Sequence, residues 1–409
     1  MQDSMQRTAL IIGGSMSGLL AGLMLRRAGW AVTVCERAQT ELAGRGAGIV
    51  AQPSLLATLK LFGIDARDLG VAVASRHILD RDGNITTTRD CAQVLTAWER
   101  VYRILRDLFG DADYRRGQGL ADIAQDADGV TAHFADGTTM RADLLVGADG
   151  FRSTVREHCV PGVPLRYAGY AAWRALVPEE SLPADVLRDV FPYMAFGLPP
   201  GEQFLAYPVA GDDNDLRVGH RRLNVIWYRP ADEATVLREL LTDMQGKTHA
   251  LSIPPPLIRP QVIAAMKDAA ERLLAPQFRA VVRLIGNPNV PPILQLIYDL
   301  VAPQMAFGRV ALIGDAAFLI RPHVGAGVSK AADDATALAR ALDTQPVEAG
   351  LRHFAAERYP IGLRAVEQAR HLGAYLQATR TEEEQSRAQR HSTDAAVLAE
   401  TALVDFLDA

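Results

Sequence analysis

The stretch TALIIGGSMSGLLAGLMLRRAGWAVTVCE, residues 8–36, decides how the chain begins to fold. Its first five residues are a short apolar run of the length typical of a buried strand, and glycines end it abruptly. Leucines then recur at helical spacing over 19–25, and Gly29 follows as the helix C-cap. A second apolar strand, 31–35, ends at Glu36. The order strand, glycine turn, helix, strand within about 30 residues predicts the opening of a dinucleotide-binding fold.

The glycine turn of this unit has the features of a phosphate-binding loop. It reads Gly13-Gly14-Ser15-Met16-Ser17-Gly18, which is the pattern G-x-G-x-x-G with serine at the middle glycine. Ser15 can keep the close backbone approach to a pyrophosphate and add a hydroxyl donor, and the helix N-terminus beyond it supplies free N–H groups. Glu36, 23 residues after the first glycine, can accept both hydroxyls of an adenosine ribose. A glycine turn of some other α/β protein is the alternative interpretation.

Two further aspartates follow apolar strands later in the chain. Asp149 comes after the strand expected over 142–146, and Asp315 comes after the strand expected over 309–313. Open α/β sheets bind ligands at the carboxyl ends of their strands, so these aspartates are expected near the glycine turn. Residues 325–327 then open another helix, a second place where N–H groups can face an anion or an electron-rich ring edge.

The middle and the end of the chain differ from this first unit in residue composition and in predicted secondary structure. The segment 165–230 is rich in aromatic and β-branched residues, and this composition predicts an antiparallel sheet. We expect mostly helix over 231–300, with a break at the prolines 254–256, and helix again from 325 onward. The highly charged stretch 381–390 is interpreted as a solvated face or a loose helix.

Composition excludes several classes of protein. The chain has 409 residues, 49% of them hydrophobic and 22% charged. Its net charge of −5 provides no positive electrostatic field that would attract nucleic acid. Three widely spaced cysteines match neither a disulfide framework nor a zinc site. Residues 8–25 are uncharged, but their glycines and serines and the lack of a cleavage site argue against a signal peptide or a membrane span. We therefore expect a cytoplasmic protein with no nucleic-acid, membrane or metal partner.

Together, the motifs at 13–18, 147–156 and 314–327 resemble those of the single-component FAD-dependent aromatic hydroxylases of the para-hydroxybenzoate hydroxylase type. In that family the first motif binds the ADP half of FAD, the aspartate matching Asp315 holds the ribitol, and the segment matching Asp149 serves both FAD and NAD(P)H. Ser15 departs from the family's usual glycine. The cofactor-binding residues that the resemblance implies are Gly13, Ser15, Met16, Ser17, Gly18, Glu36, Arg37, Arg45, Val50, Gln52, Arg103, Leu120, Asp149, Asp315, Pro322, Gly325, Ala326, Gly327 and Val328.

The resemblance also implies the fold. We expect an α/β architecture, with a FAD-binding Rossmann-like three-layer domain, an inserted antiparallel-sheet substrate domain and C-terminal helices. The expected bounds are 1–75, 100–160 and 300–345 for the FAD-binding domain, 76–99 and 161–299 for the substrate domain, and 346–409 for the C-terminal helical region. Further shared segments point to family members that hydroxylate a hydroxypyridine ring; these segments are 48–53, 167–174, 206–208 and 321–323.

The implied activity is that of a monooxygenase. It would hydroxylate an electron-rich aromatic or N-heteroaromatic ring with NAD(P)H and O2, through a flavin C4a-hydroperoxide. FAD is the expected cofactor and NADH or NADPH the expected cosubstrate, bound transiently because the chain has no second dinucleotide fingerprint. A small aromatic molecule is the expected partner, and a homodimer is allowed for. Two alternatives stay open: a flavoprotein oxidase or reductase on the same fold, and a flavin-binding protein without enzymatic activity.

Three residues are candidates for the substrate pocket. His323 lies in a loop expected beside the flavin, where an imidazole can accept a proton from a ring hydroxyl or can serve as a structural residue at a helix start. Tyr207 and Tyr228 lie on strands of the aromatic-rich sheet and can either bind a substrate hydroxyl or pack in the core. We interpret Trp173-Arg174 as structural, a packed strand residue and an ion pair, and Asp333-Asp334 as residues that face solvent or cap a helix.

Overall fold

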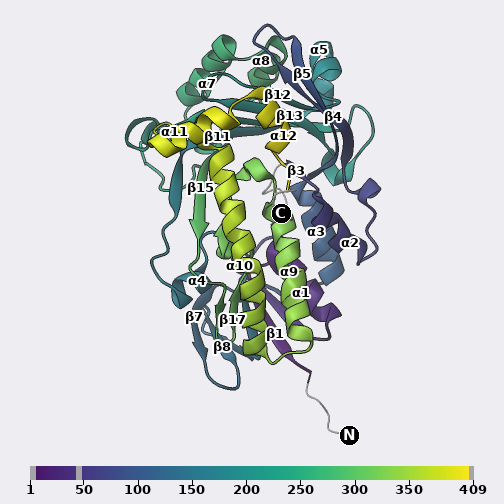
Figure 1. Ribbon diagram of the computed structural model, residues 1–409, viewed down its shortest axis with the longest axis vertical. Helices are drawn as coiled ribbons and strands as arrows, with labels where there is room; N and C mark the ends of the chain where they lie inside the picture. The colour runs from purple at the N-terminus through teal and green to yellow at the C-terminus, as the bar shows by residue number, and fades with distance from the viewer. Residues whose placement is uncertain (1–5, 43–47, 405–409) are drawn as a thin grey trace.

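The structure, a computed structural model, describes residues 6–42 and 48–404. Within these residues, two large sheets lie one above the other along the long axis of the molecule. The helices α9 and α10 run along this axis, from the level of the lower sheet toward the upper sheet (Figure 1). The helices are α1 Met16–Arg27, α2 Pro53–Lys60, α3 Trp98–Phe109, α4 Thr154–Cys159, α5 Ala184–Asp189, α6 Arg238–Leu241, α7 Pro260–Leu273, α8 Pro276–Leu284, α9 Gly327–Asp343, α10 Val347–Leu372, α11 Glu382–His391 and α12 Asp394–Glu400.

The lower sheet in Figure 1 is built around the unit that opens the chain. In the described residues its strand order is β16-β17-β10-β1-β2-β6, and β1 pairs in parallel with both of its neighbours. The strands are β1 Thr8–Ile12, β2 Ala31–Glu36, β6 Tyr114–Arg116, β10 Leu144–Gly147, β16 Ala306–Phe307 and β17 Val310–Leu312. The expected first helix is confirmed as α1, and Gly29 follows it with φ +86°, the left-handed conformation typical of the residue after a C-cap.

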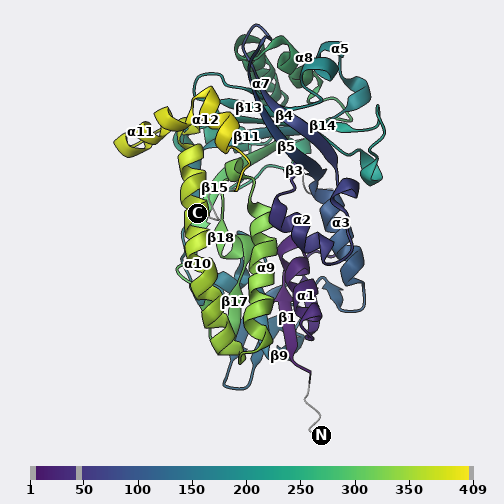
Figure 2. The ribbon, with the colours of Figure 1, turned by 45° about the vertical axis from the view of Figure 1, so that its right-hand side comes forward.

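This lower sheet is the middle of three layers. Its strand β1 is buried on both faces, so both faces need a cover. Helices such as α1 and α9 supply one cover, and the small antiparallel sheet β7 (Leu120–Gln125), β8 (Val130–Phe134) and β9 (Thr139–Ala142) supplies the other (Figures 1 and 2). Ile11 of β1, Leu19 of α1 and Phe134 of β8 belong to the same buried apolar cluster. The expected three-layer α/β fold class is confirmed.

The upper sheet brings together strands from distant parts of the chain. Its order in the described residues is β18-β15-β11-β14-β13-β12-β4-β5-β3. The strands are β3 Gly48–Val50, β4 Val71–Leu79, β5 Ile85–Ala97, β11 Arg166–Pro178, β12 Met194–Gly197, β13 Gln203–Val209, β14 Arg222–Pro230, β15 Ile293–Val301 and β18 Phe318–Leu319. The antiparallel pairing of β11, β13 and β14 confirms the sheet expected over 165–230.

The two faces of the upper sheet have different covers, because side chains alternate along each strand. Trp173 and Trp227, which oppose each other on β11 and β14, point into a core shared with α7 and α8. The neighbouring pair, Ala172 and Tyr228, points the other way, toward the lower sheet. Tyr207 of β13 shares this second face. The face directed toward the lower sheet is therefore the roof of the space between the two sheets.

Two expectations from the sequence need correction or refinement. Helix does not continue to residue 300, because residues 293–301 form β15, which pairs with β11. The charged stretch 381–390 is a true helix, α11, which begins with a capping box between Thr381 and Glu384 (Figure 2). The domain bounds given above stay a prediction. In the part of the chain that the structure describes, no helix is long and apolar enough to cross a membrane.

Candidate active site

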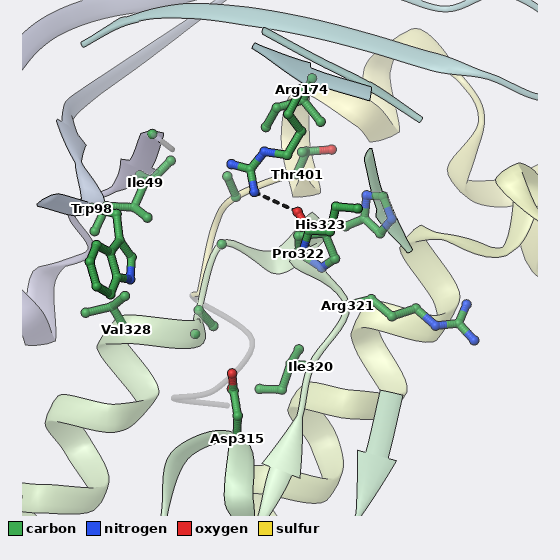
Figure 3. A pocket seen from close by; sticks show the side chains of 18 of the residues that line it. Ile49, Trp98, Arg174, Asp315, Ile320, Arg321, Pro322, His323, Val328 and Thr401 are labelled. Atoms are coloured by element: carbon green, nitrogen blue, oxygen red, sulfur yellow. Dashed lines mark hydrogen bonds between the residues drawn. The ribbon is translucent and has the colours of Figure 1, made fainter. Parts of the chain in front are cut away.

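A cavity of about 350 Å³ lies between the two sheets. Its floor includes the glycine turn before α1 and the short helix η6 (Gly314–Ala316), and its roof is the upper sheet with Tyr207 and Tyr228. One wall is the loop that contains the short helix η7 (Pro322–Val324) and leads into α9 (Figure 3). The expected site residues that line this cavity are Ser15, Met16, Ser17, Val50, Tyr207, Tyr228, Asp315, Pro322, His323, Gly325, Ala326, Gly327 and Val328.

A second cavity, of about 250 Å³, continues from the first. The two share Ser15, Ser17, Trp98 and Asp315 as lining residues, so they form one elongated space. The expected site residues that line only this second cavity are Gly13, Glu36, Arg37, Leu120 and Asp149. A long, bent space that begins at a β-α-β unit has the shape required by an extended dinucleotide.

The glycine turn leaves the start of α1 available to a ligand. Ser15 is the N-cap, but in the described structure its side chain makes no capping hydrogen bond and the first turn of α1 has no acidic residue. The first N–H groups of this twelve-residue helix therefore face the cavity without a side-chain acceptor. Gly13 has φ +108°, and a Cβ there would meet the Ala148 carbonyl oxygen at 2.4 Å, so only glycine fits. Such an end favours a phosphate group.

Glu36 connects the glycine turn with the next loop. One carboxylate oxygen accepts the N–H of Gly14 at 2.9 Å and the other accepts the N–H of Ala38 at 2.8 Å. Each carboxylate oxygen has a second lone pair, so Glu36 can still accept hydroxyl groups from a ligand in the second cavity. These two backbone bonds fix the direction in which the carboxylate points.

Asp315 is placed where the two cavities meet. Its carboxylate accepts no hydrogen bond from any residue within 6–42 or 48–404, and burial raises its pKa. The nearby Lys330 opposes this rise, but its ammonium is bonded to Asp334 at 2.7 Å. The carboxylate is half-buried and opens into the two cavities, so hydroxyl groups of a ligand would supply the missing donors. Asp315 therefore has the properties of a ligand-binding carboxylate.

Asp334 corrects an interpretation made from the sequence. It neither faces solvent nor caps a helix, since it is 1% exposed and bonded to Lys330 at 2.7 Å and to Arg358 at 2.9 Å. One oxygen also accepts the Gly314 N–H at 3.1 Å. These bonds join α9 and α10 to the turn that carries Asp315. The isolated Asp-Asp pair gave no signal of this, because its partners lie on other turns and on another helix.

Several expected cofactor residues have other contacts. Asp149 lines the second cavity, but its carboxylate caps α4, accepting the Ser153 hydroxyl at 2.5 Å and the Thr154 N–H at 2.7 Å. Gln52 is buried and donates to the Ala402 carbonyl at 2.9 Å. Arg103 lies on the surface of α3 and pairs with two acidic residues, Glu99 and Asp213, away from both cavities. Gly18 packs against the Gly13 carbonyl and lines neither cavity, and Arg45 lies outside the described residues.

His323 is held rigidly in the wall of the cavity. Its Nε2 shares a hydrogen bond of 2.7 Å with the hydroxyl of Tyr170, and its carbonyl oxygen accepts the Ala402 N–H at 2.6 Å. Burial, together with the charge of Arg321, lowers the pKa of His323 to about 3, whereas burial raises the pKa of Tyr170 to about 12. Both groups are therefore neutral near pH 7. A neutral imidazole can form a hydrogen bond with a ligand, and the bond shared with Tyr170 fixes its orientation.

The roof of the cavity holds two phenols and a guanidinium. In the described part of the chain neither the Tyr207 nor the Tyr228 hydroxyl has a hydrogen-bond partner, and burial raises both pKa values, that of Tyr207 to about 12. Arg174 points down from β11 and donates to the Gln295 side-chain oxygen at 2.7 Å (Figure 3). Its Nε is buried without a partner. All three side chains thus offer donors to a ligand.

Arg174 differs from the other arginine that lines the cavity. Arg321 is paired with the fully buried Asp299 at 2.9 Å, and Arg370 supports the same carboxylate at 2.6 Å. Among the described residues Arg174 has no carboxylate partner, so the ion pair expected from the sequence is not formed, while Trp173 packs in the core as expected. Arg174 is the functional candidate that the sequence interpretation missed. In the sequence, Arg174 looks like any other residue of a packed strand. Only the alternation of side chains along β11 in the structure shows that it faces the cavity.

The chain is similar in sequence to known flavin-binding proteins. Residues 6–166 and 297–369 match the family described as FAD binding domain, and residues 167–295 match the one described as FAD binding domain-like. The 2,6-dihydroxypyridine 3-monooxygenase of Paenarthrobacter nicotinovorans is 36% identical over 334 residues, 80% of this chain and 81% of the relative. The 3-amino-4-hydroxybenzoate 2-monooxygenase of Streptomyces cremeus is 30% identical over 377 residues, 88% of this chain and 86% of the relative.

A solved structure agrees with these similarities. The 2,6-dihydroxypyridine-3-hydroxylase of Arthrobacter nicotinovorans superimposes with a TM-score of 0.84 at 32% sequence identity, covering 91% of this chain and 93% of that chain. The similarity therefore extends over both large sheets and the space between them.

Proposed function

The chain belongs to the FAD binding domain family, and within it to the FAD-dependent aromatic monooxygenases, and we propose that its substrate is a hydroxypyridine-like ring that binds as an anion. The enzyme class, the FAD cofactor and the use of NAD(P)H expected from the sequence are confirmed at the level of the family. They replace the two alternatives, a flavoprotein oxidase or reductase and a flavin-binding protein without activity. The ring itself and the roles of individual residues are the proposal.

The observation that carries this proposal is the unpaired charge of Arg174. A guanidinium that lines a cavity and has no carboxylate partner among the described residues is best satisfied by an anionic ligand. Loss of the proton from a ring hydroxyl makes the ring electron-rich, as the reaction requires. The dihydroxypyridine in the name of the Paenarthrobacter nicotinovorans relative has this chemistry.

Other groups in the cavity suit the same ligand. The hydroxyls of Tyr207 and Tyr228 can donate to ring oxygens or a ring nitrogen, because their raised pKa values keep them protonated. His323 lines the same cavity and is neutral, so its imidazole can form a hydrogen bond with a ring hydroxyl. The hydrogen bond that Nε2 shares with the Tyr170 hydroxyl keeps the imidazole in place. The apolar lining residues Met194, Leu205 and Ile226 keep water from the ring.

The two cavities suit FAD. We assign the ribitol to Asp315, the pyrophosphate to the start of α1 with Ser15, and the adenosine ribose to Glu36, because these groups offer unpaired acceptors and donors in that order along one space. When bound, FAD accepts a hydride from NADH or NADPH and activates O2, so that one oxygen atom enters the ring and the other leaves as water. The protein's part is to hold the ring as its anion and to exclude water.

The experiment compares pairs of compounds that differ only in their ability to ionise. NADH and NADPH oxidation, oxygen uptake and hydroxylated product are measured with hydroxypyridines, including 2,6-dihydroxypyridine, and with the matching methoxypyridines. The proposal expects the hydroxyl compounds alone to be hydroxylated. In Arg174→Met, KM for the active compound should rise about 10- to 100-fold, the effect of losing a hydrogen bond to a charged group. Arg222→Met, whose guanidinium pairs with Asp212 outside this cavity, is the control.

Two results would contradict the proposal. Equal turnover of a methoxy compound would remove the need for an anion, and an unchanged KM in Arg174→Met would remove the role of this guanidinium. The cytoplasmic location, the homodimer and the domain bounds given above stay predictions. A gel-filtration or light-scattering measurement of the holoenzyme decides the oligomeric state.

A further inference from the structure

The last described residues of the chain form part of the active-site cavity. α12 lies against β4 and β5 of the upper sheet, and the chain then turns down toward the loop of His323 (Figure 1). Thr401 and Ala402 line the same cavity as Tyr228 and His323. Figure 3 shows Thr401 beside Arg174 and above the loop of Pro322. We call residues 398–402 the C-terminal strap.

Arg76 of β4 holds this strap. Its side chain is fully buried and, within the described residues, has no carboxylate partner. One terminal nitrogen donates to the Leu398 carbonyl at 3.0 Å and to the Thr401 carbonyl at 2.6 Å. Gln93 on the neighbouring strand accepts from the rest of the guanidinium, at 2.7 and 3.2 Å. A buried cation is costly unless it is bonded, and here backbone carbonyls of the strap supply most of the acceptors.

Ala402 ties the strap to the wall of the cavity, to the segment before α2 and to β5. Its N–H donates to the His323 carbonyl, and its own carbonyl accepts from the side chains of Gln52 at 2.9 Å and Gln93 at 3.1 Å. Ala402 has φ +54°, a left-handed conformation that is unfavourable for alanine. The bonds made at this residue therefore overcome a local backbone cost. Through them the strap connects the upper sheet, the segment before α2 and the His323 loop.

We propose that the C-terminal strap is the wall that seals the substrate cavity, and that Arg76 is the positioning residue that keeps it closed. Arg76 does not itself line the cavity, so it acts only through Thr401 and Ala402. Loss of its donors leaves the Leu398 and Thr401 carbonyls without these bonds, lets the wall open and admits water next to the ring. NADH oxidation continues, because reduction needs only access of the nicotinamide, but less of the oxygen reaches the ring.

Two variants test this from opposite sides of the contact. Arg76→Met keeps the length of the side chain and removes every donor. Ala402→Pro leaves Arg76 intact but removes the N–H that bonds His323 and cannot adopt the positive φ. Arg89→Met is the matched control, since Arg89 is directly opposite Arg76 on β5 but is exposed. Ala402→Pro lies at the end of the described chain, so it keeps the test open if Arg76→Met fails to fold.

The first measurement does not depend on activity. Hydrogen exchange, followed by mass spectrometry on the FAD-loaded protein, should be about tenfold faster for the amides of residues 395–404 in both variants, and unchanged in Arg89→Met. The second measurement is hydrogen peroxide released per NADH oxidised, which should rise about threefold or more in both variants. NADH oxidation should continue in both variants, and Arg89→Met should match the wild type in its rate of NADH oxidation and in peroxide release.

The outcomes separate this proposal from the proposed substrate. Unchanged exchange in both variants would show that Arg76 and Ala402 do not hold the strap, and faster exchange with unchanged peroxide release would show that the strap does not seal the cavity. This second arm rests on the proposed function. If the wild type hydroxylates no aromatic compound, the substrate proposal fails on its own, while the exchange measurement still decides whether Arg76 holds the strap.

Discussion

The substitution Asp315→Asn should weaken FAD binding and, at the same time, leave the apoprotein at least as stable as the wild type. The two effects have opposite signs because the carboxylate has no hydrogen-bond donor from the described protein, yet lies at the junction of the two cavities. Burial raises its pKa above the ordinary value of 3.8. An aspartate with a raised pKa in the folded state destabilises that state at every pH above the unfolded value, and the neutral amide removes this cost.

The magnitude for FAD follows from the bond that is lost. A hydrogen bond to a charged group contributes about 1.5–3 kcal/mol, which corresponds to a rise in Kd of about 10- to 150-fold. The measurement is titration of the apoprotein with FAD, followed by flavin fluorescence, together with thermal unfolding of each apoprotein. Asp334→Asn is the contrast, since it breaks a buried pair with Lys330 and Arg358 and should destabilise the protein by about 3–5 kcal/mol. An unchanged Kd in Asp315→Asn, or a loss of apoprotein stability as large as in Asp334→Asn, would refute the reasoning.

Three further predictions concern the cofactor and His323. The apoprotein should bind FAD more tightly than FMN, and Glu36→Gln should weaken FAD binding but not FMN binding; equal binding of the two flavins would contradict the assignment of the adenosine end. His323→Ala should lower ring hydroxylation about 10-fold or more, because the ring loses a hydrogen bond that orients it, while flavin reduction by NADH persists and peroxide accumulates; equal coupling of NADH to product in both proteins would exclude this role for His323. Because burial lowers the pKa of His323 from 6.5 to about 3, the unfolded chain binds the extra proton below pH 6.5 and stability falls as pH falls. Wild type should therefore lose about 2 kcal/mol between pH 6.5 and pH 5 that His323→Phe retains, as measured by urea unfolding.

The cofactor half of the site could be predicted from the sequence because its signals are local. A glycine turn between a strand and a helix, and an aspartate directly after a buried strand, keep their meaning wherever the rest of the chain goes. The carboxyl ends of parallel strands meet at one edge, so Ser15, Glu36 and Asp315 were expected near one another, and all three line the two continuous cavities. The substrate candidates His323, Tyr207 and Tyr228 followed from a resemblance and from the strand pattern, and they also line a common cavity.

The rest of the site was decided only by the tertiary structure. Arg174 and Gln295 face the cavity because β11 and β15 pair with one face of the pleat directed downward, a fact that no local pattern contains. Asp334 was expected from the sequence to face solvent or cap a helix. It is buried because α10 packs against α9 and brings Arg358 to its carboxylate. Arg76 meets Thr401 across more than 300 residues of chain, so no spacing could predict their bond. Local sequence motifs determine which backbone turns can bind a phosphate group or a ribose. The charge of a cavity and the segments that close it depend on which distant parts of the chain the fold brings together.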